Sequence, residues 1–402
     1  MKVTNSWLVL SIFSILISCK KTKLSTTPAS TTFTFSSSAA YSFAGTGTYN
    51  RSFSASLPAA STPSIFALTQ TGVLIAASQV EDNATGFAAF SALGQPADGS
   101  YTAGYSNAPS SSKRELVLFR STSSNLELFS ATRSSTNNAS VFSLKTTIPS
   151  QASGVVSMAE TADSEYILLV SGSGTTHKIL KRGFTSNALN DTYSVTASAV
   201  GSTISSGKKA LSANLNNSSD SGNDRNEYEF LLVGSTSVRV LIPSGNGLYA
   251  DSAIITRSGS AEIVDAAMVR WDGDQYPDLL LLTASGLEYY KNSSASGALI
   301  SFAAGRNLLS STIDVGTPTR FLVADLNADQ FQDLVIFRNG DSPLYLQTGS
   351  GLTLIDKTSI AFGSQLNSSF ADASTGDFNG DNRIDISFFE VDGTVTTFLA
   401  NN

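Results

Sequence analysis

The chain of 402 residues contains one cysteine and one histidine, and these shortages exclude several kinds of active site. Because Cys19 stands near the N-terminus, the remainder of the chain can form neither a disulfide nor a thiol-based triad. A single histidine, His177, cannot build a histidine-rich metal centre. A Ser-His-Asp site would have to use His177, yet no Gly-x-Ser-x-Gly sequence supplies a nucleophile elbow. The residues around His177 predict an exposed turn or a strand edge.

Charged residues are also scarce, at 14% of the chain compared with about 25% in typical globular proteins. Serine, threonine, asparagine and glycine replace them, which favours turns and exposed strands. No cluster of basic residues is long enough to follow a phosphate backbone, and the net charge is -7, so we expect no nucleic-acid partner. Beyond the N-terminus no window has apolar residues at helical spacing, and an all-β fold is expected.

Long hydrophobic runs are missing as well. The apolar stretch from Leu8 to Ile17 has ten residues, too few to span a bilayer, which takes about 20, but enough for the core of a signal peptide. It ends in Leu16-Ile17-Ser18-Cys19, which resembles the lipobox of bacterial lipoproteins. The resemblance implies that residues 1–18 are a signal peptide and that Cys19 is lipidated. An ordinary signal peptide with an incidental cysteine is the alternative.

The segment after Cys19 predicts how the chain is anchored. Residues 19–38 are rich in serine and threonine and are expected to form a flexible tether, although the alternation in Thr31 to Phe35 is typical of a strand. Lys20 stands where an aspartate would favour the inner membrane in enterobacterial lipoproteins. We therefore expect an exported lipoprotein in the outer membrane, on its periplasmic or cell-surface face, with one domain over residues 39–402.

Seven short apolar runs recur along this domain. The residues that open them are Ile65, Leu116, Ile167, Phe230, Leu279, Leu334 and Ile386. Their separations are 51, 51, 63, 49, 55 and 52 residues, and the long step contains a polar insertion from Asn217 to Asn226. A period near fifty is that of propeller blades. The sequence therefore predicts a seven-bladed β-propeller of four-stranded antiparallel blades.

The sixth unit can be divided into four strands, at residues 320–324, 334–337, 344–346 and 352–355, with a hairpin signal at Asn339-Gly340. The last unit ends after its third strand, at Leu399. We expect the N-terminal segment, within Thr31 to Thr48, to supply the missing fourth strand. That pairing would close the ring and cover its open sheet edges.

Two acidic nonapeptides precede the last two apolar runs, with oxygen-bearing side chains at loop positions 1, 3, 5 and 9. These residues are Asp325, Asn327, Asp329 and Asp333 in the first loop, and Asp377, Asn379, Asp381 and Asp385 in the second. Oxygens at alternate positions of a tight turn can converge on a hard cation, and calcium suits them better than magnesium, which keeps more water. Two calcium sites are therefore expected, with plain Asp-rich turns as the alternative.

A third loop, residues 270–278, has Asp272, Asp274 and Asp278 at positions 3, 5 and 9 but Arg270 at position 1. It is either a third calcium site or a metal-free copy. The guanidinium group of Arg270 could replace the charge of the cation by pairing with one of these carboxylates. We favour the metal-free copy.

The pattern D-x-N-x-D-x-x-x-D-L resembles the FG-GAP/VCBS repeat of integrin α-subunit propellers and many bacterial surface proteins. Residues 321–337 and 373–389 carry it, and residues 266–282 carry it less fully. The resemblance implies that the loop between the first two strands binds calcium, with backbone carbonyls of Phe331 and Arg383 as further ligands. It also implies protein or glycan contacts on the opposite face. Position 6 is Gln330 or Asn382 rather than glycine, and asparagine suits a left-handed backbone better than glutamine.

These features predict a surface-anchored, calcium-stabilised, monomeric propeller that binds a protein or a polysaccharide as an adhesion or scaffold module, without catalytic residues. A glycan-active propeller enzyme, lyase or glycosidase, is the alternative, because two carboxylates suffice for such chemistry. A propeller lectin is another. The pairs Tyr289-Tyr290 and Phe388-Phe389 could line a sugar-binding surface, but blade packing also requires aromatic residues.

Overall fold

The chain divides into two units, residues 1–31 and residues 32–402. The structure is a computed structural model. It describes residues 33–42, 49–56, 63–69, 74–77, 91–92, 101–110, 113–120, 123–133, 140–149, 154–161, 165–175, 177–185, 188–195, 204–216, 228–244, 249–257, 259–295, 300–349, 352–368, 370–390, 392 and 394–401. The predicted signal peptide, Cys19 and the 217–226 insertion lie outside these ranges. No helix in the described part is long and apolar enough to cross a membrane.

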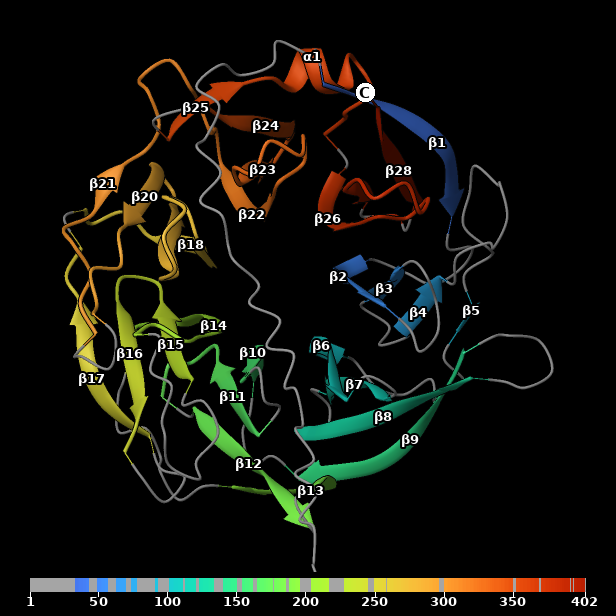
Figure 1. The fold of residues 1–402 in the computed structure, drawn as a ribbon, viewed down its shortest axis with the longest axis vertical. Coiled ribbons are helices and arrows are strands. Elements are labelled where there is room, and N and C mark those ends of the chain that lie inside the picture. Colours follow the sequence, from blue (N-terminus) through green and yellow to red (C-terminus); the bar gives the residue numbers. More distant parts are fainter. Residues whose placement is uncertain are drawn as a thin grey trace, which may run out of the picture. The chain divides into compact units, whose positions relative to one another are not determined.

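The fold is all-β, as predicted: the described strands form seven four-stranded antiparallel sheets (Figure 1). Sheet 1 contains β2 (Tyr49–Ser56), β3 (Pro63–Thr69), β4 (Leu74–Ala77) and β5 (Ser91–Ala92), and sheet 2 contains β6 (Tyr101–Ser110), β7 (Lys113–Arg120), β8 (Asn125–Arg133) and β9 (Ser140–Pro149). Sheet 3 contains β10 (Val155–Glu160), β11 (Tyr166–Ser171), β12 (Lys178–Thr185) and β13 (Ala188–Val195). Sheet 4 contains β14 (Gly207–Ala213), β15 (Glu229–Gly234), β16 (Val238–Pro243) and β17 (Tyr249–Ile255).

The remaining three sheets hold the acidic loops. Sheet 5 contains β18 (Ile263–Val269), β19 (Asp278–Thr283), β20 (Gly286–Tyr290) and β21 (Arg306–Asn307), and sheet 6 contains β22 (Pro318–Ala324), β23 (Asp333–Arg338), β24 (Asp341–Gly349) and β25 (Thr353–Asp356). Sheet 7 contains β26 (Phe370–Gly376), β27 (Asp385–Glu390), β28 (Thr394–Asn401) and, from the N-terminal end, β1 (Thr34–Ser42). The seven residues that open the predicted apolar runs each lie in the second strand of a different sheet.

The second strands are apolar without interruption because both of their faces are covered. In β19 the alternate residues Leu279 and Leu281 pack in a core cluster with β15, and Leu280 and Leu282 pack in another cluster with β23. Successive side chains of a strand point to opposite faces, so each second strand contributes to two cores. This explains the recurrent buried run, since a strand covered on one face only would alternate between apolar and polar residues.

The N-terminal strand completes the last sheet, as the sequence predicted. β1 pairs antiparallel with β28, with Phe35 opposite Ala400. It begins at Thr34, so the end of the predicted tether belongs to a strand. The ring of Phe35 stacks on Phe362, with centroids 4.5 Å apart. Phe362 ends α1 (Thr358–Phe362), a short helix that the sequence did not predict, and it packs edge-on against Phe398.

The first strands connect the sheets. Each first strand contacts the first strand of the next sheet, in the order β2, β6, β10, β14, β18, β22, β26. The last of them, β26, also contacts β2. Every first strand has a β-bulge near its start. The residues that follow the bulge, here called the inner belt, are Arg51, Ala103, Ser157, Lys209, Asp265, Arg320 and Asp372.

Four residues of the inner belt join neighbouring sheets through ion pairs. Lys209 Nζ lies 2.6 Å from Asp265 Oδ1, and Arg320 Nη1 lies 2.5 Å from Asp372 Oδ2. Asp265 also accepts a hydrogen bond of 3.2 Å from the backbone N–H of Phe321 in sheet 6. A single carboxylate in sheet 5 therefore contacts the sheets on both sides of it.

Candidate functional site

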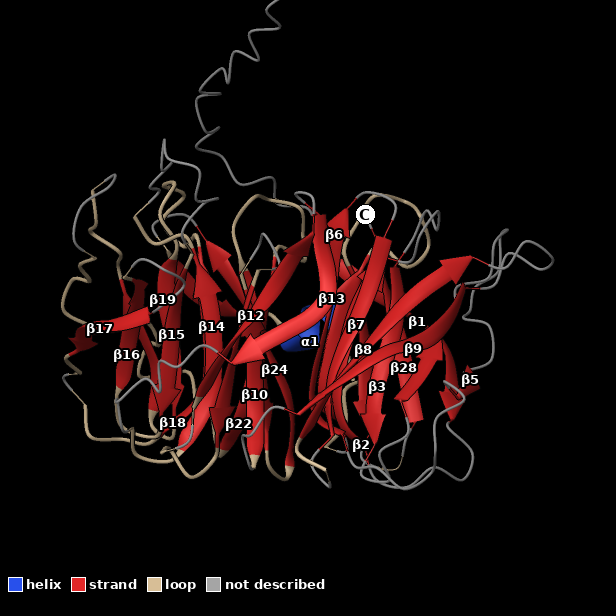
Figure 2. Cartoon of the chain, turned by 90° about the horizontal axis from the view of Figure 1, so that it is seen from below, coloured by secondary structure: helices blue, strands red, loops and turns tan. Residues whose placement is uncertain are grey.

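The three acidic loops connect the first strand to the second in sheets 5, 6 and 7, and therefore lie at the same end of their sheets (Figure 2). Their tight turns need left-handed backbone conformations. In the 377–385 loop these fall on Gly380 (φ 79°) and Asn382 (φ 65°), residue types that adopt them readily. In the 325–333 loop they fall on Ala328 (φ 58°) and Gln330 (φ 74°), where a β-carbon makes them less favourable. The 377–385 loop is therefore the less strained of the two.

The carboxylate at position 1 holds the loop backbone. Asp377 Oδ1 accepts hydrogen bonds from the N–H groups of Gly380 (2.7 Å) and Asp381 (3.0 Å), and its Oδ2 accepts one from Asn382 (2.8 Å). Asp325 accepts equivalent bonds from Asp329 and Gln330. Both carboxylates are thus directed toward the interior of the turn.

Positions 3, 5 and 7 are linked in the same way. The side-chain amide of Asn327 donates to Asp329 Oδ2 at 2.9 Å, and Asp329 Oδ1 accepts the N–H of Phe331 at 2.8 Å. In the 377–385 loop the corresponding distances are 3.1 Å, from Asn379 to Asp381, and 2.9 Å, from Arg383 to Asp381. Hydrogen bonds therefore link the predicted donors at positions 1, 3 and 5 of each loop through the backbone of one turn.

Position 9 fixes each loop to the third strand of its sheet. Asp385 Oδ2 accepts the N–H of Phe378 at 2.8 Å, and Asp385 Oδ1 accepts that of Ala400 in β28 at 2.9 Å. Asp333 and Asp278 make the same pair of bonds in their own sheets, and all three position-9 carboxylates are fully buried. Position 9 thus has a structural role that the sequence did not reveal.

The two complete loops concentrate negative charge, and Arg383, the basic residue within the second loop, forms no ion pair with its carboxylates in the described structure. Burial raises the pKa of Asp333 to about 7 and that of Asp385 to about 6, against the effect of their backbone hydrogen bonds, and neighbouring loop carboxylates raise both further. Burial also raises the pKa of Asp325. In the described part of the chain, no lysine or arginine forms an ion pair with either loop. A bound cation would relieve this crowding of like charges.

The 270–278 loop has such a counterion, but it is not the predicted one. Arg270 is exposed and pairs with no carboxylate within the described residues, so the hypothesis that its guanidinium group replaces the cation is wrong. Lys291, just after β20, hydrogen-bonds to Asp272, and its Nζ lies 3.4 Å from Asp274 Oδ2. Burial alone would raise the pKa of Asp272, but the hydrogen bonds from Lys291 and from the Asp274 N–H lower it.

The donor set of the two complete loops fits a hard cation, since it consists of carboxylate and amide oxygens. No three acidic, histidine or cysteine side chains are already arranged around one point within the described ranges. The features of these loops that favour a metal ion are therefore the types of donor, their spacing and the uncompensated negative charge of their carboxylates. Asp325, Asn327, Asp329 and Asp333 would hold one ion, and Asp377, Asn379, Asp381 and Asp385 the other.

His177 forms no hydrogen bond with a serine hydroxyl or a carboxylate among the described residues. It is buried, with 2% of its surface exposed, which corrects the prediction of an exposed residue. Its Nε2 lies 3.0 Å from the backbone carbonyl of Gly174, whereas its Nδ1 has no hydrogen-bond partner among the described residues. Burial lowers the pKa of His177.

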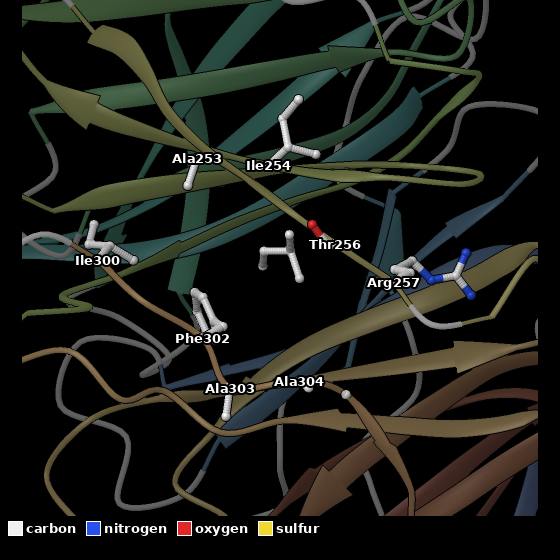
Figure 3. A pocket seen from close by; sticks show the side chains of 10 residues that line it. Ala253, Ile254, Thr256, Arg257, Ile300, Phe302, Ala303 and Ala304 are labelled. Carbon is white, nitrogen blue, oxygen red and sulfur yellow. The ribbon is translucent and has the colours of Figure 1, made fainter.

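Two hollows lie away from the acidic loops. One of about 350 Å³ is polar, and it lies beside the β19–β20 turn, at the end of sheet 5 opposite the 270–278 loop. Among its lining residues are Ser285, Asn307, Ser310, Ser311 and Asp314. The other, of about 400 Å³, lies between β17 and residues 300–305 and is mainly apolar (Figure 3).

Among the described residues that line the apolar hollow, Thr256 and Arg257 are the ones with polar side chains. Ile300 and Phe302 line one side of it, and the guanidinium group of Arg257 points away from them (Figure 3). That guanidinium group is already paired with Glu288, at distances of 3.1 and 2.8 Å. The hollow therefore suits an apolar contact rather than recognition of a charged or hydroxyl-rich ligand.

Comparison with known proteins places the acidic loops in a sequence family. No protein of curated function matches the chain. A family model described as an FG-GAP-like repeat matches residues 325–387, a segment that includes both complete acidic loops and the strands between them. This part of the chain therefore contains an FG-GAP-like repeat, in agreement with the resemblance carried by the D-x-N-x-D-x-x-x-D-L pattern.

Proposed function

We propose that the chain is a seven-bladed β-propeller in which each four-stranded sheet is one blade. Support comes from the seven sheets in chain order, from the contacts that run through all the first strands and return from β26 to β2, and from the pairing of β1 with β28. Pairing of the two chain ends in one blade is an effective way to close such a ring, because it leaves no blade incomplete.

Calcium is proposed to bind the 325–333 and 377–385 loops and to stabilise the fold rather than to perform chemistry. The backbone carbonyls of Phe331 and Arg383 would complete the ligand sets at position 7. The observation that carries this proposal is the charge contrast between the loops: the two with a full ligand set have no basic partner in the described structure, and the incomplete one has Lys291. Extracellular calcium modules often bind with dissociation constants of about 10⁻⁴–10⁻³ M.

The proposed role is a non-catalytic binding or scaffold module for a protein or a polysaccharide, held on the outer membrane by lipid on Cys19. The polar hollow supports a polysaccharide partner, since hydroxyl and amide side chains are suited to hydrogen bonds with sugars. Among the described residues that line it, Asp314 is the one that carries a carboxylate. The carboxylate of Asp341 lies beside the lining residue Gly316, and two carboxyl groups are what glycoside hydrolysis ordinarily requires, so the binding test must also look for shortened polymer.

Incubation of the purified protein with a panel of bacterial cell-surface polysaccharides tests the binding role. We expect saturable binding with no change in polymer length, and weaker binding by Asn307→Ala and Asp314→Ala. Ser252→Ala, an exposed position in β17 that does not line the hollow, is the control and should bind as the wild type does. Shortened polymer would overturn the non-catalytic proposal. Binding that both hollow variants retain would show that the ligand binds elsewhere.

A further inference from the structure

We propose that the ammonium group of Lys291 is the built-in cation of the 270–278 loop, and that the residue at this register position decides whether an acidic loop takes up a divalent metal ion. The first part is argued from contacts of the described residues. The second rests on the proposed calcium function of the other two loops. Together they make one loop independent of metal and leave two dependent on it.

The position of Lys291 can be compared across sheets because strand register fixes it. Tyr290 pairs with Leu279 in sheet 5, as Leu346 pairs with Leu334 in sheet 6 and Phe398 with Ile386 in sheet 7. The next residue along each chain segment is therefore equivalent, and these residues are Lys291, Gln347 and Leu399. The residue after that donates its N–H to the position-9 carboxylate in all three sheets.

The register thus places a basic residue beside the loop that lacks a carboxylate at position 1, and an uncharged residue beside each complete loop. Lys291 contacts the carboxylates of both Asp272 and Asp274. These are the position-3 and position-5 groups, the counterparts of proposed metal ligands. An ammonium group at that point neutralises part of the loop charge and repels a divalent cation, so the loop has both a weaker ligand set and an occupied charge site.

Reciprocal substitutions test the second part by counting the calcium ions bound per chain at equilibrium. We expect two ions for the wild type, and three for Arg270→Asp combined with Lys291→Gln, which supplies the missing position-1 carboxylate and the register residue of the 325–333 loop. Gln347→Lys and Leu399→Lys should each reduce the number to one. Gln347→Met and Leu399→Met, which add length without charge, are the controls and should still bind two. An unchanged count in the Lys variants would overturn the proposal.

Arg270→Asp alone separates the two features of the loop. With Lys291 in place we expect it to bind two ions, as the wild type does. Uptake of a third ion by this single variant would show that the ammonium group does not exclude metal, and would overturn the role given to Lys291.

A wild type that binds no calcium would overturn the proposed function but not the first part of this inference, which melting curves in EDTA test separately. Lys291→Gln should lower the melting temperature by about 1–3 °C, since an exposed ion pair contributes little. Asp272→Asn, added to Lys291→Gln, should restore part of the loss because it removes the carboxylate left without a partner. An unchanged melting temperature in Lys291→Gln, or a further loss in the double variant, would contradict the role of Lys291.

Discussion

Sheets 3 and 6 have the same topology but connect their first two strands in different ways. In sheet 3 the turn is closed by Thr161, whose N–H donates to the carbonyl of Tyr166 at 3.0 Å and whose hydroxyl accepts the N–H of Tyr166 at 3.0 Å. In sheet 6 the connection and the first residue of β23 together form the acidic loop, residues 325–333, which has three aspartates. Both sheets pair four antiparallel strands, so the fold does not require a carboxylate set at loop positions 1, 5 and 9.

The acidic loops lower the stability of the folded chain when their buried carboxylates are ionised and no cation is bound. A buried carboxylate whose pKa is raised, such as Asp333, is less stable when ionised in the folded chain than in water. In sheet 3 the turn is closed by the Thr161 hydroxyl, and the nearby carboxylate of Glu165 is paired with Lys181 at 3.2 Å. Sheets 6 and 7 have complete carboxylate sets, and a bound cation would compensate their negative charge. In sheet 5 the ammonium group of Lys291 compensates part of the charge instead.

The largest expected effect comes from removing a position-9 carboxylate. Asp333→Ala leaves the N–H groups of Leu326 and Thr348 and the hydroxyl of Tyr345 without their acceptor. We expect a loss of about 3–5 kcal/mol in the free energy of unfolding, measured with urea. Thr161→Val, its counterpart in sheet 3, should cost only about 1–2 kcal/mol because fewer donors lose their acceptor. Equal costs would show that the acidic loop is no better anchored than the threonine turn.

The inner belt offers the next largest effect. Asp265→Ala removes the ion pair with Lys209 and the acceptor for the Phe321 N–H, and should cost about 2–3 kcal/mol. Its counterpart in sheet 3, Ser157, accepts one hydrogen bond among the described residues, from the Ala210 N–H at 3.1 Å, so Ser157→Ala should cost about 1 kcal/mol. Urea unfolding of both variants measures the difference. A smaller loss for Asp265→Ala than for Ser157→Ala would contradict the bridging role of Asp265.

The two kinds of sheet also show what a sequence can and cannot predict. The seven apolar runs were predictable because strands covered on both faces must be apolar throughout, and Ile65 to Ile386 keep that period. The strand that completes sheet 7 was predictable from an incomplete last unit. The carboxylates at positions 1, 3, 5 and 9 were visible as local spacing, although calcium itself remains a prediction.

Features that depend on distant contacts were not predictable. Helix α1 has five residues and owes its place to the packing of Phe362 against Phe35 and Phe398, which are remote in sequence. The contact of Lys291 with Asp272 follows from the pairing of β19 with β20, which no local spacing shows. His177 stands among polar residues in the sequence, yet it is buried by the fold.

Calcium should have a smaller effect, confined to sheets 6 and 7. With millimolar calcium and a dissociation constant of about 10⁻⁴–10⁻³ M, each site contributes about 1 kcal/mol, a rise of at most a few degrees in melting temperature. Asp381→Ala should remove the share of its own loop, and Asp329→Ala the rest. Asp274→Ala, in the loop with Lys291, should leave the calcium response unchanged while lowering stability. Melting curves with EDTA and with calcium measure this, and superimposable wild-type curves would mean that the loops bind no calcium.

The smallest effect should be the pH dependence contributed by His177 in sheet 3, far from any acidic loop in sequence. Burial lowers the pKa of His177 in the folded state below its value of about 6.5 in the unfolded chain. The unfolded state therefore takes up this proton first as the pH falls. The stability that neutral His177 contributes is complete above about pH 6.5 and is lost as the pH falls toward the folded-state pKa.

His177→Gln isolates this contribution, because a glutamine amide can still donate to the carbonyl of Gly174 but does not titrate. Between pH 7.5 and pH 5 the wild type should lose more stability than the variant, so the difference between their melting temperatures should shift in favour of the variant as the pH falls. Measurements in EDTA keep any bound calcium from adding its own pH dependence. Parallel pH profiles for the two proteins would mean that His177 titrates alike in the folded and unfolded states, and that its burial in sheet 3 carries no charge penalty.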